Sequence, residues 1–412
     1  MGTGLETGVD PKQYRLGTHR VVPPHVTLDR VQPHLSAMGI TRVANITGLD
    51  RTGFPVVTVC RPNARSLSVS QGKGLDRDSA RVSGIMESVE TYHGEHIHAP
   101  LRYGSVSELE HRIPLADVAS LPRSQAGRFS PDCSMFWIEG LNLLDQRPLW
   151  LPLETVSVDY TLPLPPGNGC FAASSNGLAS GNTRLEAISH GINEVVERDA
   201  MTLWKLRNAA QRGRQMIDPD SVDDPDCRAA LARFADAGIA ISIWDVSSDV
   251  GIAAFCCLAH GDSEDDADPE FGAGCHPARE VALLRALTEA AQARTTFIAG
   301  SRDDLGAALY RNGARRERRA YCLGLVSGHA PSGDFRRTPT FASDAIADDV
   351  SWTLERLQAI GIGQIVVVDL TRAEFSLPVV RVVVPGLEGP FGHEQGDFVP
   401  GPRARALGSL GP

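Results

Sequence analysis

The sequence is poor in long apolar runs, in closely spaced cysteines and in lysine. No apolar stretch approaches the roughly 20 residues that a membrane-spanning helix needs, and the N-terminal stretch lacks the apolar core of a secretory signal. The eight cysteines form no C-x-x-C pair, which favours buried thiols over disulfides or a structural zinc site. We therefore expect a cytoplasmic protein.

Acidic residues outnumber basic ones, 50 to 40. The formal net charge is −10 and the isoelectric point is near 5.7, so the chain has no electrostatic footprint for nucleic acid. Lysine occurs only at Lys12, Lys73 and Lys205, whereas arginine is abundant. Lys73, within "SVSQGKGLD", is a candidate for function because lysine is a compact point charge and arginine is a planar fork.

Strand-like and helical stretches follow one another irregularly. Runs rich in Val, Ile and Thr predict strands at 41–48, 55–62, 239–246, 251–260, 364–371 and 378–386. Helical patterns cover 78–95, 183–206, 227–237, 277–299 and 345–360. This order predicts an α+β fold with mixed β-sheets and packed helices. We divide the chain into an N-terminal α/β segment (1–65), a main domain (66–400) and an irregular Gly- and Pro-rich tail (401–412).

One side of the predicted helix at 183–206 carries carboxylates. At about 100° per residue, Glu194 and Glu197 lie within about 80° of Glu186, while the aliphatic residues point to the opposite side. The helix at 78–95 aligns Glu87 and Glu90 in the same way, together with Ser83. The helix at 277–299 aligns Arg285, Glu289 and Gln292.

The first two of these helices share a pattern that suggests internal duplication. Glu87 lies thirteen positions after Gly74, and Glu194 lies thirteen positions after Gly181. Each glutamate begins an E-x-x-E pair, and the helix with Glu289 is a looser third copy. Chance is the alternative explanation. We expect Gly74 and Gly181 to form tight turns, and alanine there to weaken ATP binding if the backbone needs a positive φ.

A carboxylate face has two explanations. It can be a solvated surface, and Glu186 can simply complete a capping box with Thr183. Solvated helices, however, usually alternate glutamate with lysine or arginine four residues on, and here only Glu194 has such a partner, Arg198. Unpaired carboxylates that converge need a cation, and Mg²⁺ suits oxygen ligands that are shared with phosphate.

Three motifs in order resemble the YcaO family: "GKGLDRDSARVSGIMESVE", "SSNGLASGNTRLEAISHGINEVVERDA" and "ALTEAAQAR". The resemblance implies a YcaO-type fold, with 66–400 as an ATP-binding catalytic domain, and it implies ATP and Mg²⁺ as cofactors. By position, the catalytic and Mg²⁺-binding carboxylates would be Glu87, Glu90, Glu194 and Glu197. The residues of the nucleotide pocket would be Lys73, Ser83, Asn182, Glu186, Arg198, Glu289, Gln292 and Arg294, and more weakly Arg285.

The resemblance also implies a reaction. Family members activate a peptide backbone amide by phosphorylating its oxygen, and the nucleophile then decides the product. External sulfide gives a thioamide, whereas a neighbouring Cys, Ser or Thr side chain gives an azoline. The tail "VPGPRARALGSLGP" lacks the P-x-P-x-P ending of azoline-forming relatives, and the segments "THRVVPPHVTLDR" and "VVVPGLEGPFG" are similar to the branch that works with a TfuA-type partner.

We therefore expect thioamide formation in a ribosomally made peptide or protein, with a TfuA-like protein delivering sulfur. The alternatives are an azoline-forming cyclodehydratase and a nucleotide-binding partner subunit without activity. A homodimer is compatible with the resemblance, and we expect neither a nucleic acid nor a membrane as partner. His190 lies on the carboxylate side of its helix, where it either assists proton transfer or is an ordinary helix histidine.

Overall fold

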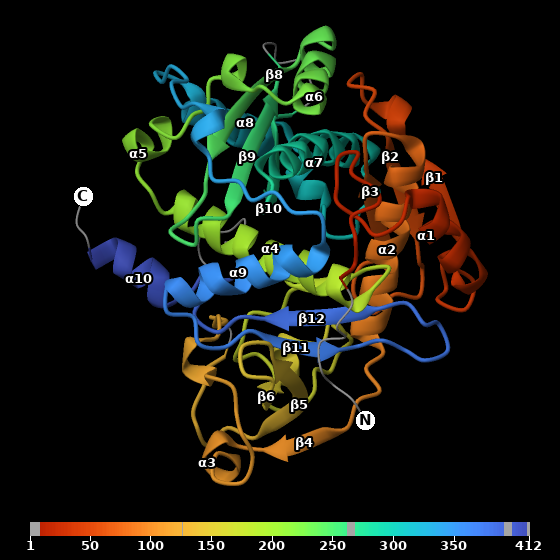
Figure 1. Cartoon of the computed structure of the whole chain (residues 1–412), viewed down its shortest axis with the longest axis vertical. Helices are drawn as coiled ribbons and strands as arrows, with labels where there is room; N and C mark the ends of the chain where they lie inside the picture. The colour runs from red at the N-terminus through yellow and green to blue at the C-terminus, as the bar shows by residue number, and fades with distance from the viewer. Residues whose placement is uncertain (1–8, 126, 262–267, 391–397, 410–412) are drawn as a thin grey trace.

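The computed structural model describes residues 9–125, 127–261, 268–390 and 398–409 (Figure 1). Its strands form three antiparallel sheets. The ends of the chain at 1–8 and 410–412, which belong to the predicted first segment and tail, lie outside the described residues. No helix of the described residues is both long and apolar enough to cross a membrane.

The first sheet and the second sheet repeat one arrangement of three strands followed by a helix. The first unit consists of β1 (Arg42–Asn45), β2 (Val56–Cys60), β3 (Val69–Lys73) and α2 (Arg77–Glu95). The second consists of β8 (Ala240–Asp245), β9 (Ala253–His260), β10 (Glu270–His276) and α7 (Arg279–Ala299). In both units the strands pair in chain order, and the last strand packs against its helix. Figure 1 shows the two units side by side above the third sheet.

Two glycines fix how closely each helix lies on its sheet. A Cβ on Gly72 would collide with the backbone of α2 at Ala80 and Gly84. A Cβ on Gly274 would collide with the backbone of α7 at the matching positions, eight and twelve residues further along the chain. Both contacts need a residue without a side chain. The duplicated segments are therefore those that contain Glu87 and Glu289. The sequence pattern had instead matched Glu87 with Glu194 and treated the helix with Glu289 as a looser third copy.

The third sheet forms the other half of the molecule. Its strand order is β4 (Leu101–Gly104), β5 (Met135–Asn142), β11 (Val366–Asp369), β12 (Val379–Val383) and β7 (Leu178–Ser180), and β6 (Pro148–Pro152) pairs with β5. Helix α4 (Arg184–Lys205) follows β7 and contacts β12, β10 and α9 (Ile346–Ala359). Ile188, Ile192 and Val195 of α4 are buried, as the helix periodicity predicted. Helix α4 thus lies between the third sheet and the duplicated units.

The remaining helices lie around these elements. They are α1 (Pro24–Val31), α3 (Val106–Leu109), α5 (Ala209–Gly213), α6 (Pro225–Asp236), α8 (Asn312–Val326) and α10 (Pro402–Ser409). Helix α10 corrects the expectation of an irregular tail. Strand β2 pairs with β3 across residue 65, so the N-terminal segment shares a sheet with the main domain, and the division of the chain stays a prediction.

Gly74 and Gly181 do not need a positive φ. Neither residue is among the described glycines with positive φ. Both lie instead against the start of the helix that follows: a Cβ on Gly74 would come within 2.8 Å of the nitrogen of Ala80, and one on Gly181 within 2.8 Å of the carbonyl oxygen of Thr183. Close approach of the backbone, rather than a left-handed conformation, explains these glycines.

Candidate active site

Three helices bring five glutamates together between the sheets. Glu87 and Glu90 come from α2, Glu194 and Glu197 from α4, and Glu289 from α7. Their charges act on one another: Glu194 raises the pKa of both α2 carboxyls, and Glu289 raises that of Glu197. The convergence predicted from three separate helix faces is therefore present in the structure.

Backbone amides orient two of the carboxylates in the same way in the two units. The N–H of Gln71 donates to Glu87 over 3.4 Å, and the N–H of Ala273 donates to Glu289 over 3.3 Å. Each donor is the residue immediately before the glycine that contacts the helix. The repeated unit thus places one helix carboxylate beside its own last strand.

The segment that contains β7 orients two more carboxylates. Glu90 accepts hydrogen bonds from the N–H of Ser180 at 2.8 Å and from its hydroxyl at 2.7 Å. Glu194 accepts one from the N–H of Gly177 at 3.3 Å. Because β7 belongs to the third sheet, the carboxylates of α2 and α4 are held against that sheet as well as against the duplicated units.

Basic side chains neutralise part of this acidic cluster. The ammonium group of Lys73 lies 2.6 Å from Glu289, and Arg198 lies 3.4 Å from Glu197. Arg198 also acts on Glu194, the partner that the sequence pattern gave it. The carboxylates are therefore less isolated than the sequence suggested, and the compensation is strongest on the side of α7.

The pKa values show which carboxylates lack a nearby positive charge. Burial, together with the neighbouring carboxylates, raises the pKa of Glu87 to about 7 and that of Glu90 to about 8. Burial acts on Glu289 too, but Lys73 and Arg198 outweigh it and lower its pKa to about 2. The α2 carboxylates would thus gain most from an added cation, and oxygen ligands are those that Mg²⁺ prefers. The residues present fit that ion.

If closeness of ligand atoms were the only criterion, a different set of residues would be the candidate metal site. Among the described residues, only ligand atoms of His19, His276 and Asp349 come together, all within 4.8 Å of one another. The carboxylate of Asp349 already binds the ammonium group of Lys12 at 2.8 Å, and Nδ1 of His276 accepts from the N–H of Ala278 at 3.0 Å. A neutral imidazole that accepts at Nδ1 carries its proton on Nε2, so this group does not offer three free ligands.

Two of the residues expected in the nucleotide pocket organise the start of α4. Glu186 is 3% exposed and accepts from Arg20 at 3.2 Å and from the N–H of Val21 at 3.0 Å. It also accepts from the side chain of Asn182 at 3.0 Å. Thr183 caps the helix as predicted, but the carboxylate of Glu186 binds Asn182 and the N-terminal segment. These residues anchor residues 20–21 beside the acidic cluster.

The other expected pocket residues differ in position. Ser83 lies on α2 and is partly exposed. Gln292 donates to the carbonyl oxygen of Gln71 at 3.2 Å, which is the residue that orients Glu87. Arg294 is 2% exposed and binds Asp50 through two nitrogens at 3.1 and 3.2 Å. The structure therefore brings Ser83 and Gln292 to the α2 side of the cluster and separates Arg294 from it.

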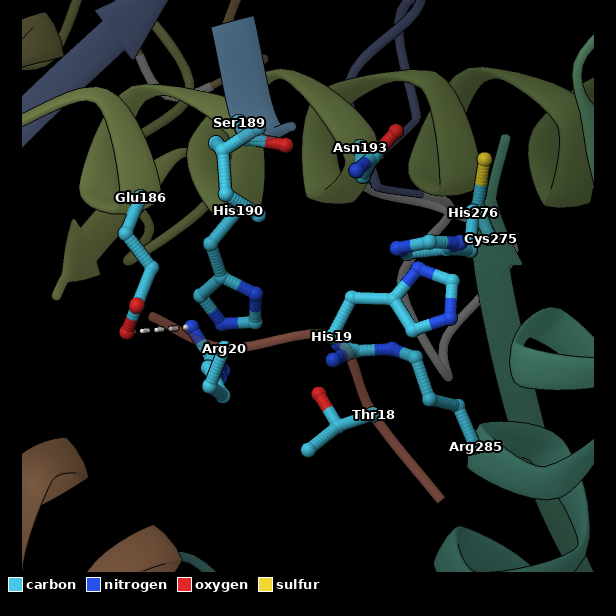
Figure 2. A pocket seen from close by; sticks show the side chains of 11 residues that line it. Thr18, His19, Arg20, Glu186, Ser189, His190, Asn193, Cys275, His276 and Arg285 are labelled. Atoms are coloured by element: carbon cyan, nitrogen blue, oxygen red, sulfur yellow. Dashed lines mark hydrogen bonds and ion pairs between the residues drawn. The ribbon is translucent and has the colours of Figure 1, made fainter. Parts of the chain in front are cut away.

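A pocket opens beside the cluster, between the N-terminal segment, α4, β10 and α7 (Figure 2). Its lining includes His19, Arg20, His190, Asn193, His276 and Arg285. Burial lowers the pKa of His190 well below its usual value, and Arg285 lowers it further. Arg285 also acts on Glu194 and Glu197, so the pocket and the acidic cluster adjoin, with a neutral imidazole at their junction.

The sequence analysis missed three basic residues that lie near the pocket or act on the acidic cluster. His19 comes from an irregular N-terminal segment, Arg302 from the loop after α7, and Arg381 from β12. None lies at a helical spacing from the carboxylates. Only the similarity of "THRVVPPHVTLDR" to a known branch pointed toward the first of them.

The comparison with known families decides what this arrangement is. The model of the YcaO cyclodehydratases, described as binding ATP and Mg²⁺, matches residues 71–388. The chain belongs to the YcaO family. The predictions of family, α+β fold and the cofactors ATP and Mg²⁺ are thereby confirmed.

Relatives of this YcaO protein include proteins of bacteria and archaea. A protein of Rhizobium leguminosarum bv. trifolii, named for its place in the 3′ region of tfuA, is 37% identical over 90% of this chain and 88% of its own length. A protein of Methanothermobacter thermautotrophicus is 33% identical over 90% of this chain and 95% of its own length. The first of these is consistent with the TfuA-associated branch.

Solved structures share the fold. A heterocyclase in complex with substrate and cofactor is 26% identical, with a TM-score of 0.77 over 94% of this chain. This chain spans 55% of the length of that heterocyclase. YcaO from Methanopyrus kandleri, bound with AMPPCP and Mg²⁺, is 22% identical, with a TM-score of 0.75 over 95% of this chain and 98% of that one. The second likeness concerns the fold alone.

Proposed function

We propose that this YcaO protein uses ATP to replace the oxygen of a peptide backbone amide with sulfur, so that a thioamide forms. In the balanced reaction, the amide, hydrosulfide and ATP become the thioamide, ADP and phosphate. The observation that carries the proposal is the gathering of Glu87, Glu90, Glu194 and Glu197 in a YcaO fold. The relative that is named for the tfuA region supports sulfur as the nucleophile.

Each group of side chains has a proposed role. Glu87, Glu90, Glu194 and Glu197 hold Mg²⁺, which when bound neutralises charge on the nucleotide phosphates. Their ligand atoms do not close into a cluster of three within 4.8 Å, which suits ions that the protein shares with phosphate oxygens. Lys73 supplies a point charge beside Glu289, where a phosphate would meet it.

The remaining roles concern the nucleotide and the partner. We propose that Ser83, Asn182, Glu186, Arg198 and Gln292 line the nucleotide pocket. Arg294 is left out, because its bonded nitrogens face Asp50. The substrate is a precursor peptide or protein, and a TfuA-like protein delivers the sulfide.

The test uses the purified protein with ATP, Mg²⁺, sulfide and candidate precursor peptides, with and without a TfuA-like protein. We expect a product heavier than the peptide by the difference between sulfur and oxygen. Loss of the mass of one water would instead identify azoline formation, the activity suggested by the heterocyclase relative. ATP binding without any change in peptide mass would support the partner subunit without activity.

A pair of matched variants links the product to the site. Glu194→Gln removes a proposed Mg²⁺ ligand and should abolish product formation while the fold is retained. Glu317→Gln makes the same chemical change on the exposed surface of α8 and should leave product formation unchanged. Equal activity of both variants would contradict the proposed roles.

A further inference from the structure

A buried arginine of the third sheet lacks the partner that buried arginines usually have. Arg381 lies on β12 and is 3% exposed. Its Nη2 donates to the carbonyl oxygen of Ser174 at 2.8 Å. Its Nε and Nη1, which carry three of its five N–H donors, have no hydrogen-bond partner among the described residues.

Strand geometry places Arg381 on the side of the sheet that faces α2. Side chains alternate along a strand. Val380 and Val382 belong to the core cluster around α4, whereas Val379 and Val383 belong to the cluster that includes α2. Arg381 therefore shares the face of the second pair. On the neighbouring strand, that is the side from which Glu90 binds Ser180.

The charges around Arg381 identify its neighbours. Glu194 and Tyr160 both act on its guanidinium. No described carboxylate lies within 4.0 Å of it, since no ion pair joins it to one.

A buried cation without a counter-ion costs free energy of folding. Burial lowers the pKa of Arg381 to about 10. The contrast is Arg61, also 3% exposed, whose two terminal nitrogens lie 2.6 and 2.7 Å from the carboxylate of Glu95. The fold supplies a carboxylate where an arginine only stabilises structure. At Arg381 it leaves donors open, beside the cluster of Mg²⁺-type ligands.

We propose that Arg381 binds the phosphoryl group after it has left the nucleotide. Arginine is well suited to phosphate oxygens because its N–H donors make charge-assisted hydrogen bonds. Lys73 and Arg198 lie beside Glu289 and Glu197, toward α7. Arg381 approaches from the third sheet. Lys73 and Arg198 therefore suit the phosphate while it is still on the nucleotide, and Arg381 suits it after the transfer. This inference rests on the proposed function.

The step balances as follows. Hydrosulfide adds to the amide carbon, and the carbonyl oxygen becomes an oxyanion. A bond forms between this oxygen and the γ-phosphorus, while the bond between that phosphorus and ADP breaks. The carbon–oxygen bond then breaks, phosphate leaves, and the nitrogen lone pair and loss of the thiol proton give the thioamide. Arg381 transfers no proton; its guanidinium compensates negative charge on the phosphoryl oxygens.

The test measures binding of inorganic phosphate to the protein loaded with Mg²⁺ and ADP, by calorimetry. In Arg381→Met we expect the affinity for phosphate to fall at least about tenfold, in line with the loss of charge-assisted hydrogen bonds. The affinity for Mg²⁺–AMPPNP should stay within about twofold, because that analogue keeps its γ-phosphate on the nucleotide. The melting temperature should be unchanged or higher, since an unpaired buried cation is removed.

The control is Arg61→Met, which should lower the melting temperature and leave phosphate affinity unchanged. Unchanged phosphate affinity in Arg381→Met would overturn the proposal. So would an equal loss of AMPPNP affinity, because Arg381 would then bind the phosphate of the intact nucleotide. A melting temperature that falls as much as in Arg61→Met would assign Arg381 a structural role. Phosphate binding needs neither peptide nor sulfide, so its outcome is independent of whether a thioamide forms.

Discussion

Replacing Glu90 with glutamine should stabilise the protein at alkaline pH while removing its response to Mg²⁺ and nucleotide. The pKa of Glu90 is raised to about 8 by burial and by the charges of Glu194 and Glu87, against 4.5 for a free carboxyl. The folded protein therefore holds this proton more tightly than the unfolded chain does. The carboxyl stabilises the fold below its unfolded pKa, and that contribution is lost as the pH rises through about 8.

The size of the effect follows from the shift. Between pH 6 and 8 each pH unit costs about 1.4 kcal/mol, so the carboxyl of Glu90 removes roughly 2.7 kcal/mol of stability. Unfolding entropy of about 2.1 cal/mol/K per residue over 412 residues converts this to a change of about 3 °C in melting temperature. Glutamine does not titrate, and its side-chain oxygen can still accept both bonds from Ser180.

The assay is thermal unfolding of wild type and Glu90→Gln from pH 6 to pH 9, without metal or nucleotide. The melting temperature of the variant relative to wild type should rise by about 3 °C across this range. With Mg²⁺ and AMPPNP the order should reverse at pH 9, because only the wild type offers all four carboxylates.

Glu95→Gln is the matched control on the same helix. Glu95 is buried, but its bonds to Arg61 and Ser66 outweigh burial and lower its pKa. Its removal should therefore lower the melting temperature at every pH above the carboxyl range. If Glu90→Gln behaved like Glu95→Gln, Glu90 would be a compensated structural carboxylate, and the reasoning that it awaits a cation would be refuted.

Three further predictions concern the same framework. The affinity for Mg²⁺–AMPPNP, measured by calorimetry, should rise about a hundredfold between pH 6.5 and 8.5, because Glu87 and Glu90, with pKa values of about 7 and about 8, must both lose protons to bind metal; a flat profile would exclude them as ligands. Asp50→Asn should lower the melting temperature by about 4 °C, because it leaves the buried Arg294 without its counter-ion, with little change in nucleotide affinity; the reverse pattern would restore Arg294 to the nucleotide pocket. Gly274→Ala should yield insoluble or strongly destabilised protein, since its Cβ would overlap the backbone of α7, and normal thermal unfolding would contradict that packing.

Much of the site could be predicted because a helix converts sequence spacing into direction. The faces of α2 and α4 followed from a rotation of about 100° per residue, and the carboxylates do point to one place. The apolar side of α4 was equally readable, since Ile188 and Ile192 are fully buried. What periodicity cannot show is which helices meet, and that part came from the family resemblance.

The rest could not be read from spacing. The nucleotide-pocket role of Arg294 stays a prediction, and its bond to Asp50, which lies far away in the sequence, carries no signal along one helix. Arg381 was missed because a lone arginine within a run of valines carries no local signal. Arg198 does act on Glu194, as its spacing predicted, and it also lies 3.4 Å from the adjacent Glu197. For Arg294 and Arg381 a contact with a residue far away in the sequence decides the direction of the side chain, and spacing along one helix cannot reveal such a contact.

The duplicated unit explains why the site is built from two unlike charge environments. In both units the residue before the contact glycine donates its N–H to a glutamate fifteen residues after that glycine, so Glu87 and Glu289 are equivalent positions. Yet their pKa values differ, about 7 for Glu87 and about 2 for Glu289. The pKa of Glu289 is held low by Lys73, which ends β3 of the first unit and binds the glutamate of the second, and by Arg198. Duplication thus supplies two carboxylates at matching positions. A lysine from the first unit binds the carboxylate of the second, and the carboxylate of Glu87 is the one that we propose binds a metal ion.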